Sequence, residues 1–258
     1  MALLDYLISF QLWDASSSVS VMKMLAEQAE KNVNQAISDA NLPGAVKKGT
    51  FDEEFEDHEG NVHIFEKDYY ACGSCIGGDY AEVKSEYIHL ISQLTRRSAF
   101  LTIFGLFEHR MIDCLKFMIS LSGYTDNNKR TNRREKLEDC HAFLTDVIGG
   151  KGIADVDHLI ILRNIMAHND GFASKHNEIS NRIGKKTESE KRQLRAINRA
   201  ENENAGISVN EFDGVLMDKT FLMYVVGEIN RYIESLDAAV RRFHKEMPQK
   251  PAGTNSNV

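Results

Sequence analysis

Proline is almost absent from this chain, and that feature limits what the chain can fold into more than any other. The three prolines are Pro43, Pro248 and Pro251, so the whole stretch between Pro43 and Pro248 contains none. Proline removes a backbone donor and clashes with the preceding turn, which ends or kinks a helix. A long stretch without proline leaves room for long, unbroken helices, and we expect a mostly helical protein.

The composition is that of a globular protein. Of the 258 residues, 42% are hydrophobic and 27% are charged, which is ordinary for a chain long enough to bury a core. The net charge of −7 argues against a protein that coats nucleic acid over its whole surface. It remains compatible with a local basic site, because a steering field depends on where the charges lie.

Targeting and membrane signals are weak in this sequence. The start, residues 1–10, is apolar but lacks a basic segment and is interrupted by Asp5, so we expect the beginning of a packed helix and not a signal peptide. No stretch approaches the roughly 18 to 20 uncharged apolar residues of a membrane span. Four cysteines without a secretion signal predict reduced thiols and a cytoplasmic protein with no membrane partner.

Apolar residues that recur at intervals of three and four predict five helices. We expect them at residues 14–40, 82–121, 135–148, 156–168 and 219–245. Ser16, Ser17 and Ser18 are candidate N-caps for the first, and Asp155 for the fourth.

Residues 50–80 differ from the rest. An acidic stretch, the turn-forming Gly60-Asn61 and the alternation of residues 62–65 favour a hairpin or an irregular insertion. The expected fold class is therefore all-α, an up-and-down helical bundle with a small insertion near residues 50–80. We expect residues 1–80 to pack on a helical domain at 81–247, and residues 248–258 to form a disordered tail.

The most informative stretch lies at the end of the fourth expected helix, where Arg163-Asn164 precedes His168 and Asn169-Asp170-Gly171 follows it. Histidine exchanges protons near neutral pH, and arginine offers a planar, permanently charged fork that suits a phosphate. Five residues on a helix separate two side chains by about 140°, so Arg163 and His168 diverge within one chain. Asn164 and His168 share a face. The spacing favours a site shared by two copies across a two-fold axis.

This stretch resembles the Arg-x4–6-His signature of the HEPN superfamily, including the Asn after the Arg. The resemblance extends over roughly residues 80–245, where a long helix precedes the motif helix and another follows it. It implies a metal-independent endoribonuclease without cofactor, acting as a homodimer on RNA in a bacterial defence or toxin context. Arg163, Asn164, His168 and Glu108 would be its catalytic residues. A cognate antitoxin or regulatory protein is a further partner that the resemblance allows. One such form of control uses a Tyr two residues after the His, where this chain has Asp170.

Glu108 interrupts the apolar stripe of its helix, four residues after Phe104 and four before Ile112. A carboxylate in such a place is costly unless it is paired. Arg163 is the obvious partner, and an acid at about this place is common among HEPN proteins. The alternative is a side chain that reaches solvent at the edge of the stripe.

A basic segment follows the motif directly. Residues 173–200 hold eight lysine or arginine residues against three glutamates, in a chain that is acidic as a whole. Lys175, Arg182, Lys185 and Lys186 are the candidate RNA-binding residues, since they could contact phosphates beside the motif. The alternative is a solvated helix and loop face, which is the commoner meaning of a run of charge.

Two histidines and two cysteines in and near the insertion are candidate zinc ligands. His58, His63, Cys72 and Cys75 could bind zinc, although a single Cys-x2-Cys with loosely spaced histidines is a weak signal, and the alternative is an acidic loop with two exposed thiols. Cys114 and Cys140 fall within helices and are expected to be buried. The chain has no His-Glu-x-x-His or similar ligand set, which argues against a zinc-dependent hydrolase. The main rival to the enzyme is a non-catalytic helical module that binds protein or RNA.

Overall fold

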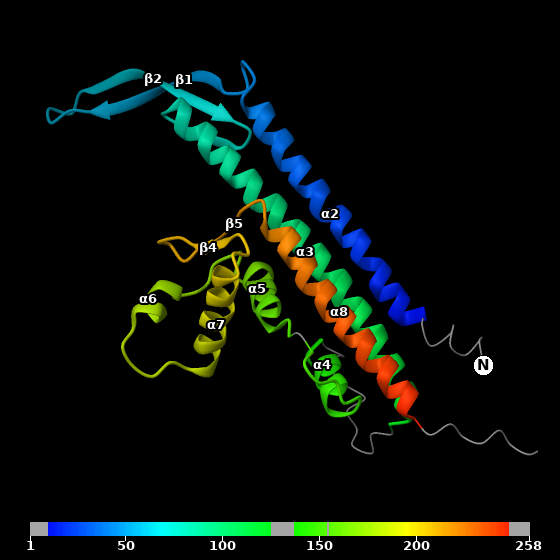
Figure 1. Cartoon of the computed structure of the whole chain (residues 1–258). Helices are drawn as coiled ribbons and strands as arrows, with labels where there is room; N and C mark the ends of the chain where they lie inside the picture. The colour runs from blue at the N-terminus through cyan, green and yellow to red at the C-terminus, as the bar shows by residue number, and fades with distance from the viewer. Residues whose placement is uncertain (1–9, 125–136, 154, 248–258) are drawn as a thin grey trace, which may run out of the picture.

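The computed structural model describes residues 10–124, 137–153 and 155–247, and it is mostly helical. Three long helices lie side by side and form the body of the molecule (Figure 1). They are α2 (Phe10–Ala40), α3 (Tyr80–Ser122) and α8 (Phe221–Glu246). The 43 residues of α3 correspond to a length of about 65 Å, so the long helices expected from the lack of proline are confirmed. No helix of the described residues is both long and apolar enough to cross a membrane.

The body is held by one apolar core to which all three helices contribute. Phe100, Phe104 and Phe107 of α3 are fully buried, and Phe107 packs edge-on against Tyr232 of α8. Leu12 and several alanines of α2 belong to the same core. A buried pair also ties α2 to α3, since Arg96 donates two hydrogen bonds of 2.8 Å to Glu30.

The ends of these helices show which capping expectations hold. Asp79 caps α3 by accepting the amides of Ala81 and Glu82, and Gly123 closes it in the left-handed conformation with φ +63°. The expected serine caps of the first helix are wrong, because α2 begins earlier. Ser17 and Ser18 lie inside it and donate their hydroxyls to carbonyls three residues back.

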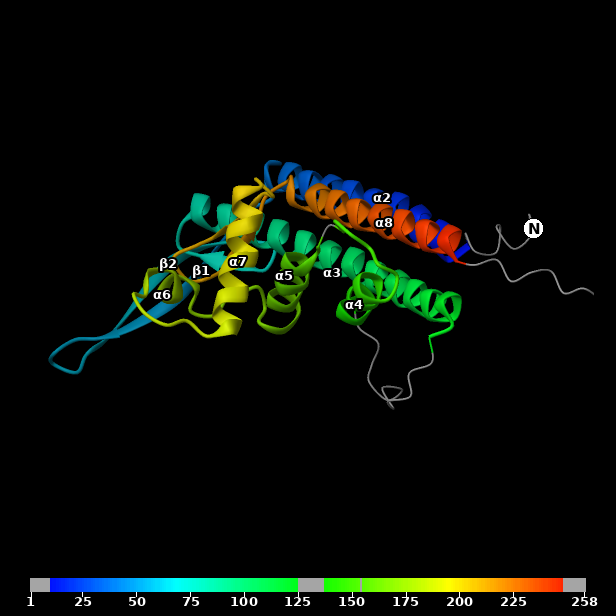
Figure 2. The ribbon, with the colours of Figure 1, turned by 60° about the horizontal axis from the view of Figure 1, so that its bottom comes forward.

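The insertion near residues 50–80 is a long β-hairpin that projects from one end of the body (Figures 1 and 2). It consists of β1 (Lys47–Glu56) and β2 (Val62–Cys72), and the short β3 (Cys75–Gly77) pairs with the end of β2. Asp57 organises the tip by accepting the amides of Glu59 and Asn61. The hairpin alternative of the sequence analysis is confirmed, with longer strands than expected.

The proposed zinc set is not brought together. Cys72 and Cys75 are opposed at the base of the hairpin, whereas His63 lies opposite Phe55 near the tip. Nine residues of strand correspond to about 30 Å. Both thiols are buried instead of exposed, which corrects the alternative reading of this loop as well. Cys114 and Cys140 are buried as expected.

The remaining elements lie on one side of the body, the side toward which the hairpin also points (Figures 1 and 2). They are α4 (Leu137–Asp146), α5 (Asp157–His168), α6 (His176–Asn181), α7 (Glu188–Asn202), β4 (Ile207–Val209) and β5 (Val215–Met217). The helices α6 and α7 and the small antiparallel pair β4–β5 are not among the elements predicted from the sequence. The polar link expected at residues 126–134 and the tail at 248–258 lie outside the described residues.

Candidate functional site

The motif helix α5 is fixed by an apolar face and by the loop ahead of it. Leu159, Leu162 and Ile165 are buried against the core. Asp155 accepts the amide of Asp157 at 3.3 Å, although the N-cap position itself is Val156. The helix therefore holds the Arg163–His168 motif at its far end against the middle of α3.

Arg163 and Glu108 form an ion pair between α5 and α3, which confirms the pairing predicted from the sequence. Arg163 Nη1 also donates to the side-chain oxygen of Asn164 at 2.9 Å, and its guanidinium carbon lies 5.6 Å from the centre of the Phe104 ring. The Arg163 and Glu108 side chains stay 26% and 29% exposed, so the fork is held in place but not sealed from solvent.

His168 is the last residue of α5 and is exposed. Its side chain forms no hydrogen bond or ion pair with a described residue, so the ring is open to a ligand or a partner. Helical geometry directs it about 140° away from Arg163, and the two residues diverge within one chain. Asn164 lies four residues before His168 on the same face.

The chain turns sharply after His168. Asp170 and Gly171 both take positive φ, +51° and +82°, and the Gly171 amide donates back to the carbonyl of Ile165 at 3.1 Å. Arg97 of α3 forms an ion pair with Asp170, and a Cβ on Gly171 would lie 2.4 Å from the Arg97 guanidinium. The Val215 amide of β5 donates to the carbonyl of Gly171 at 2.9 Å. Arg97 and β5 therefore position the end of the motif, and the sequence carried no signal for either.

The four candidate RNA-binding residues are only partly available. Arg182 pairs with Glu190 at 2.7 Å, and Lys186 donates to the Arg182 carbonyl at 2.9 Å, so both hold the loop between α6 and α7. Lys175 is exposed and lies 3.9 Å from Glu178. Lys185 is exposed and belongs to none of the ion pairs between described residues. The structure thus leaves Lys185 and Lys175 as the accessible charges of this set.

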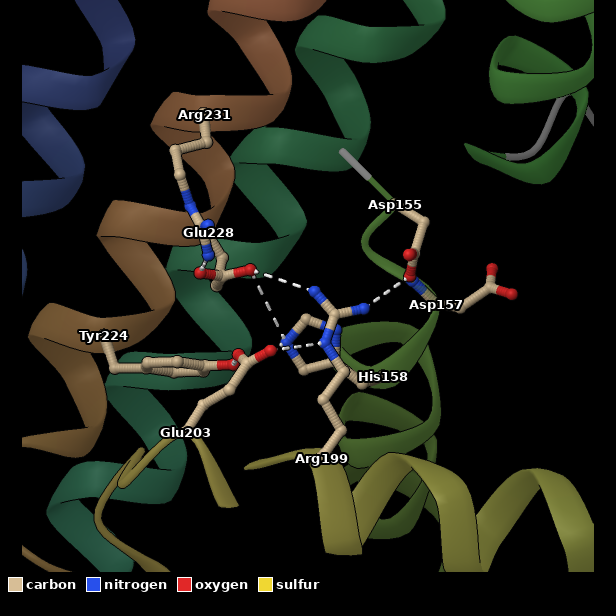
Figure 3. Close-up of polar contacts among 8 residues, drawn as sticks. All are labelled: Asp155, Asp157, His158, Arg199, Glu203, Tyr224, Glu228 and Arg231. Carbon is tan, nitrogen blue, oxygen red and sulfur yellow. Dashed lines mark hydrogen bonds and ion pairs between the residues drawn. The ribbon is translucent and has the colours of Figure 1, made fainter. Parts of the chain in front are cut away.

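A second polar cluster, not anticipated from the sequence, joins α5, α7 and α8 (Figure 3). At its centre, His158 Nε2 lies 2.9 Å from the Tyr224 hydroxyl, and that hydroxyl donates to Glu203. His158 is 2% exposed and Glu228 is 3% exposed, so both are buried in the core. Arg199 bridges the cluster by donating to Asp155 at 2.7 Å, to Glu203 at 3.0 Å and to Glu228 at 3.3 Å.

The protonation of this cluster follows from its hydrogen bonds and its burial. Because the Tyr224 hydroxyl donates to Glu203, it accepts the hydrogen of His158 Nε2. Burial, together with the nearby Arg199, lowers the pKa of His158 to about 4, so its ring is neutral at neutral pH. Burial and the bond to Glu203 raise the pKa of Tyr224.

Three residues of this cluster are of the types that bind metal ions. His158, Glu203 and Glu228 each bring one ligand atom within 4.8 Å of the others. The donor set does not fit an ion, because His158 Nε2 carries the hydrogen and the carboxylates are already bound by cations. Arg231 pairs with Glu228, and Arg199 reaches both glutamates. The two guanidiniums supply the positive charge that a metal would bring to these carboxylates, and the cluster links three helices.

The chain was also compared with known proteins. No family model, curated protein or solved structure matches it.

Proposed function

We propose that this protein is a metal-independent endoribonuclease of the HEPN type, with Arg163 and His168 as its catalytic residues. The observation that carries the proposal is that one of the two side chains is held in place and the other is free. Glu108 and Asn164 hold the Arg163 guanidinium in one orientation, while His168 stands exposed at the helix end without a partner among the described residues. A fixed cation and an accessible proton carrier are the two groups that cleavage of an RNA phosphodiester requires.

The reaction uses the substrate's own nucleophile. His168 accepts the proton of the RNA 2′-hydroxyl, the 2′-oxygen forms a bond to phosphorus, and the bond from phosphorus to the 5′-oxygen breaks. The leaving 5′-oxygen takes up a proton from water, and His168 returns its own proton to the solvent, which gives a 2′,3′-cyclic phosphate and a 5′-hydroxyl. Arg163 offsets the charge that develops on the phosphate oxygens. DNA lacks the 2′-hydroxyl and is therefore not a substrate.

The divergence of Arg163 and His168 within one chain favours a site made by two copies. In a two-fold dimer, each site takes Arg163 from one protomer and His168 from its partner. In the single chain, α5 lies on the side of the body that also carries α7 and the hairpin (Figure 1).

A non-catalytic helical module is the second candidate, and the same ion pair supports it. A contact between Arg163 and Glu108 also serves to tie α5 to α3, with no chemistry at all. The two functions differ in what His168 does. A binding module has no use for a proton carrier at that position, so its removal would leave binding unchanged.

The deciding experiment incubates the purified protein with total RNA in EDTA, beside a His168→Ala variant. His109→Ala is a matched control, since His109 is an exposed histidine elsewhere on α3. We expect the wild type and the control to cleave in EDTA and the His168→Ala variant to fail. Activity that disappears in EDTA and returns with a divalent metal would refute the mechanism, and equal cleavage by all three proteins would exclude His168.

A further inference from the structure

The β1–β2 hairpin has two chemically different faces. Residues directly opposed in an antiparallel pair share a face, so the register sorts the side chains of both strands. One face carries Phe51, Phe55, Phe65 and Tyr69. On the other face, Lys48 and Asp68 pair near the base, and the part toward the tip, which we call the acidic face, carries Asp52, Glu54, Glu56, Val62, Ile64 and Glu66.

The charges of the acidic face are not balanced within the hairpin. Asp52 lies directly opposite Glu66, and neither side chain forms a hydrogen bond or an ion pair with a described residue, although Lys48 lies close enough to attract Glu66. Like charges opposed across a strand pair destabilise it. Other hairpin acids do have partners, in the 2.7 Å pair of Asp68 with Lys48 and the 3.0 Å pair of Glu53 with Lys67.

Apolar side chains lie among these acids. Val62 and Ile64 are 60% and 63% exposed. Exposed apolar residues surrounded by unpaired charge of one sign are typical of an interface that meets the opposite sign. The acidic face therefore suits a cationic, partly apolar partner and repels nucleic acid phosphates.

A surface of that kind exists on the same chain. The loop between α6 and α7 exposes Ile183 completely, and Lys185 follows two residues later. Arg192 and Arg195 are exposed on α7. Within the described parts of the chain, the side chains of these three cations form no hydrogen bond or ion pair, although Glu188 lies close enough to attract Arg195. We call Ile183, Lys185, Arg192 and Arg195 the basic lobe.

We propose that the acidic face of one copy docks on the basic lobe of a second copy, in a reciprocal two-fold dimer. The hairpin and the basic lobe project from the same side of the helical body at different heights (Figures 1 and 2). A half-turn about an axis between the two projections places each hairpin opposite the partner's lobe. Both contacts form at once, and the assembly closes at two copies.

The two kinds of side chain have different roles in this contact. Exposed ion pairs add little affinity each, so Ile183 meeting Val62 and Ile64 supplies the desolvated centre. The four acids and three cations orient the copies and make the dimer sensitive to salt. This inference goes beyond the proposed function, because it concerns the surfaces that meet and not RNA cleavage.

Charge reversal with mixing tests the contact. One variant carries Asp52→Lys, Glu54→Lys and Glu66→Lys, and another carries Lys185→Glu, Arg192→Glu and Arg195→Glu. Light scattering at micromolar concentration and low salt gives the mass of each, with 29.2 kDa for one chain. We expect a wild-type dimer that weakens with salt, and a monomer for each variant alone. An equal mixture of the two variants should form a heterodimer, because both of its contacts again join opposite charges, and this also shows that both variants fold.

A matched control reverses three exposed acids away from the contact, Glu27→Lys, Asp39→Lys and Glu234→Lys, and should remain a dimer. A monomeric wild type, a variant that remains a dimer alone, or a mixture that stays monomeric would overturn the proposal. A lobe variant that stays dimeric but loses RNA binding would instead identify the lobe as an RNA surface. The mass measurement uses no RNA, so it tests the dimer contact independently of cleavage. If the dimer responds to charge reversal as expected but the wild type does not cleave RNA, the proposed function is wrong and the dimer contact stands.

Discussion

At the scale of single residues, His168 and Arg163 have separable roles in the proposed cleavage. Replacing His168 with Ala removes a general acid–base group, so the cleavage rate should fall by about 10²- to 10⁴-fold. The exposed position of the ring means that the fold should be unchanged, with the same circular dichroism and melting temperature. Gel assays of a labelled RNA give the rate.

A matching RNA with one 2′-deoxy position at the cut site should resist cleavage there, because it lacks the attacking hydroxyl. Cleavage at a comparable rate would point to a water nucleophile.

Arg163→Lys is a sharper test of the arginine than removal of its charge. Lysine keeps the charge but cannot bind Glu108 and Asn164 together through a planar fork. We expect impaired cleavage with binding of RNA largely retained, measured as rate and affinity on the same RNA. Full activity of the lysine variant would show that only the charge matters.

The buried His158 gives the folded state a pH dependence of predictable sign. Its pKa in the folded chain is about 4, below the value of about 6.5 in an unfolded chain. Between these values the unfolded chain binds the extra proton, so stability falls as the pH is lowered. The loss from this group approaches about 3 kcal/mol by pH 4.

Urea unfolding at several pH values, on the wild type and on His158→Gln, isolates this contribution. The glutamine variant does not titrate there, and the gap between the two stabilities should narrow as the pH falls from 6.5 toward 4. A constant gap would mean that folding does not lower the pKa of His158.

At the same scale, the sequence identified one acid in an apolar stripe and overlooked another. Glu108 interrupts the stripe of α3 and was matched with Arg163, and the pair exists. Glu228 interrupts the stripe of α8 between Val225 and Ile229 in the same way, and it too is paired, with Arg199 and Arg231. Arg231 lies three residues further along α8, but Arg199 comes from α7, in the polar segment after the motif, and no pattern in the sequence predicts how that segment lies against α8.

At the scale of elements, the capping box of α7 decides how firmly the basic lobe is held. The Thr187 hydroxyl accepts the amide of Glu190, and the Glu190 carboxylate accepts the amide of Thr187. Removing such a cap costs about 1 kcal/mol. Thr187→Ala should therefore lower the free energy of unfolding by about that amount in urea titrations.

Ser189→Ala is the matched control for this prediction, because Ser189 is an exposed residue of the same first turn. It should change the stability by no more than a few tenths of a kcal/mol. If both variants lose the same stability, the capping box contributes nothing beyond helix propensity.

Helices with a long apolar repeat could be predicted from the sequence, and short elements without one could not. The helices α3 and α8 could be read from the sequence because apolar residues repeat over many turns without proline to end them. The pair β4–β5 could not, since strands of three residues have no period to detect. The start of α2 was misplaced because serine fits a cap and a helix interior alike, as Ser18 shows by bonding back to Ala15.

At the scale of the whole molecule, the proposed dimer and the proposed chemistry meet in one experiment. Each site is proposed to take Arg163 from one protomer and His168 from the other. An Arg163→Ala chain and a His168→Ala chain are then each inactive. In a mixed dimer, one site has lost both residues and the other has kept both.

Mixing equal amounts of these two inactive chains, after dissociation in high salt and return to low salt, should therefore restore activity. Random reassociation makes half of the dimers mixed, and each mixed dimer has one intact site of two, so activity should return to about a quarter of the wild-type level. Cleavage of a labelled RNA before and after mixing measures this. If Arg163 and His168 of one chain serve the same site, no dimer in the mixture holds an intact pair, and the mixture would stay as inactive as its components. The recovered fraction thus distinguishes a shared site from two independent ones.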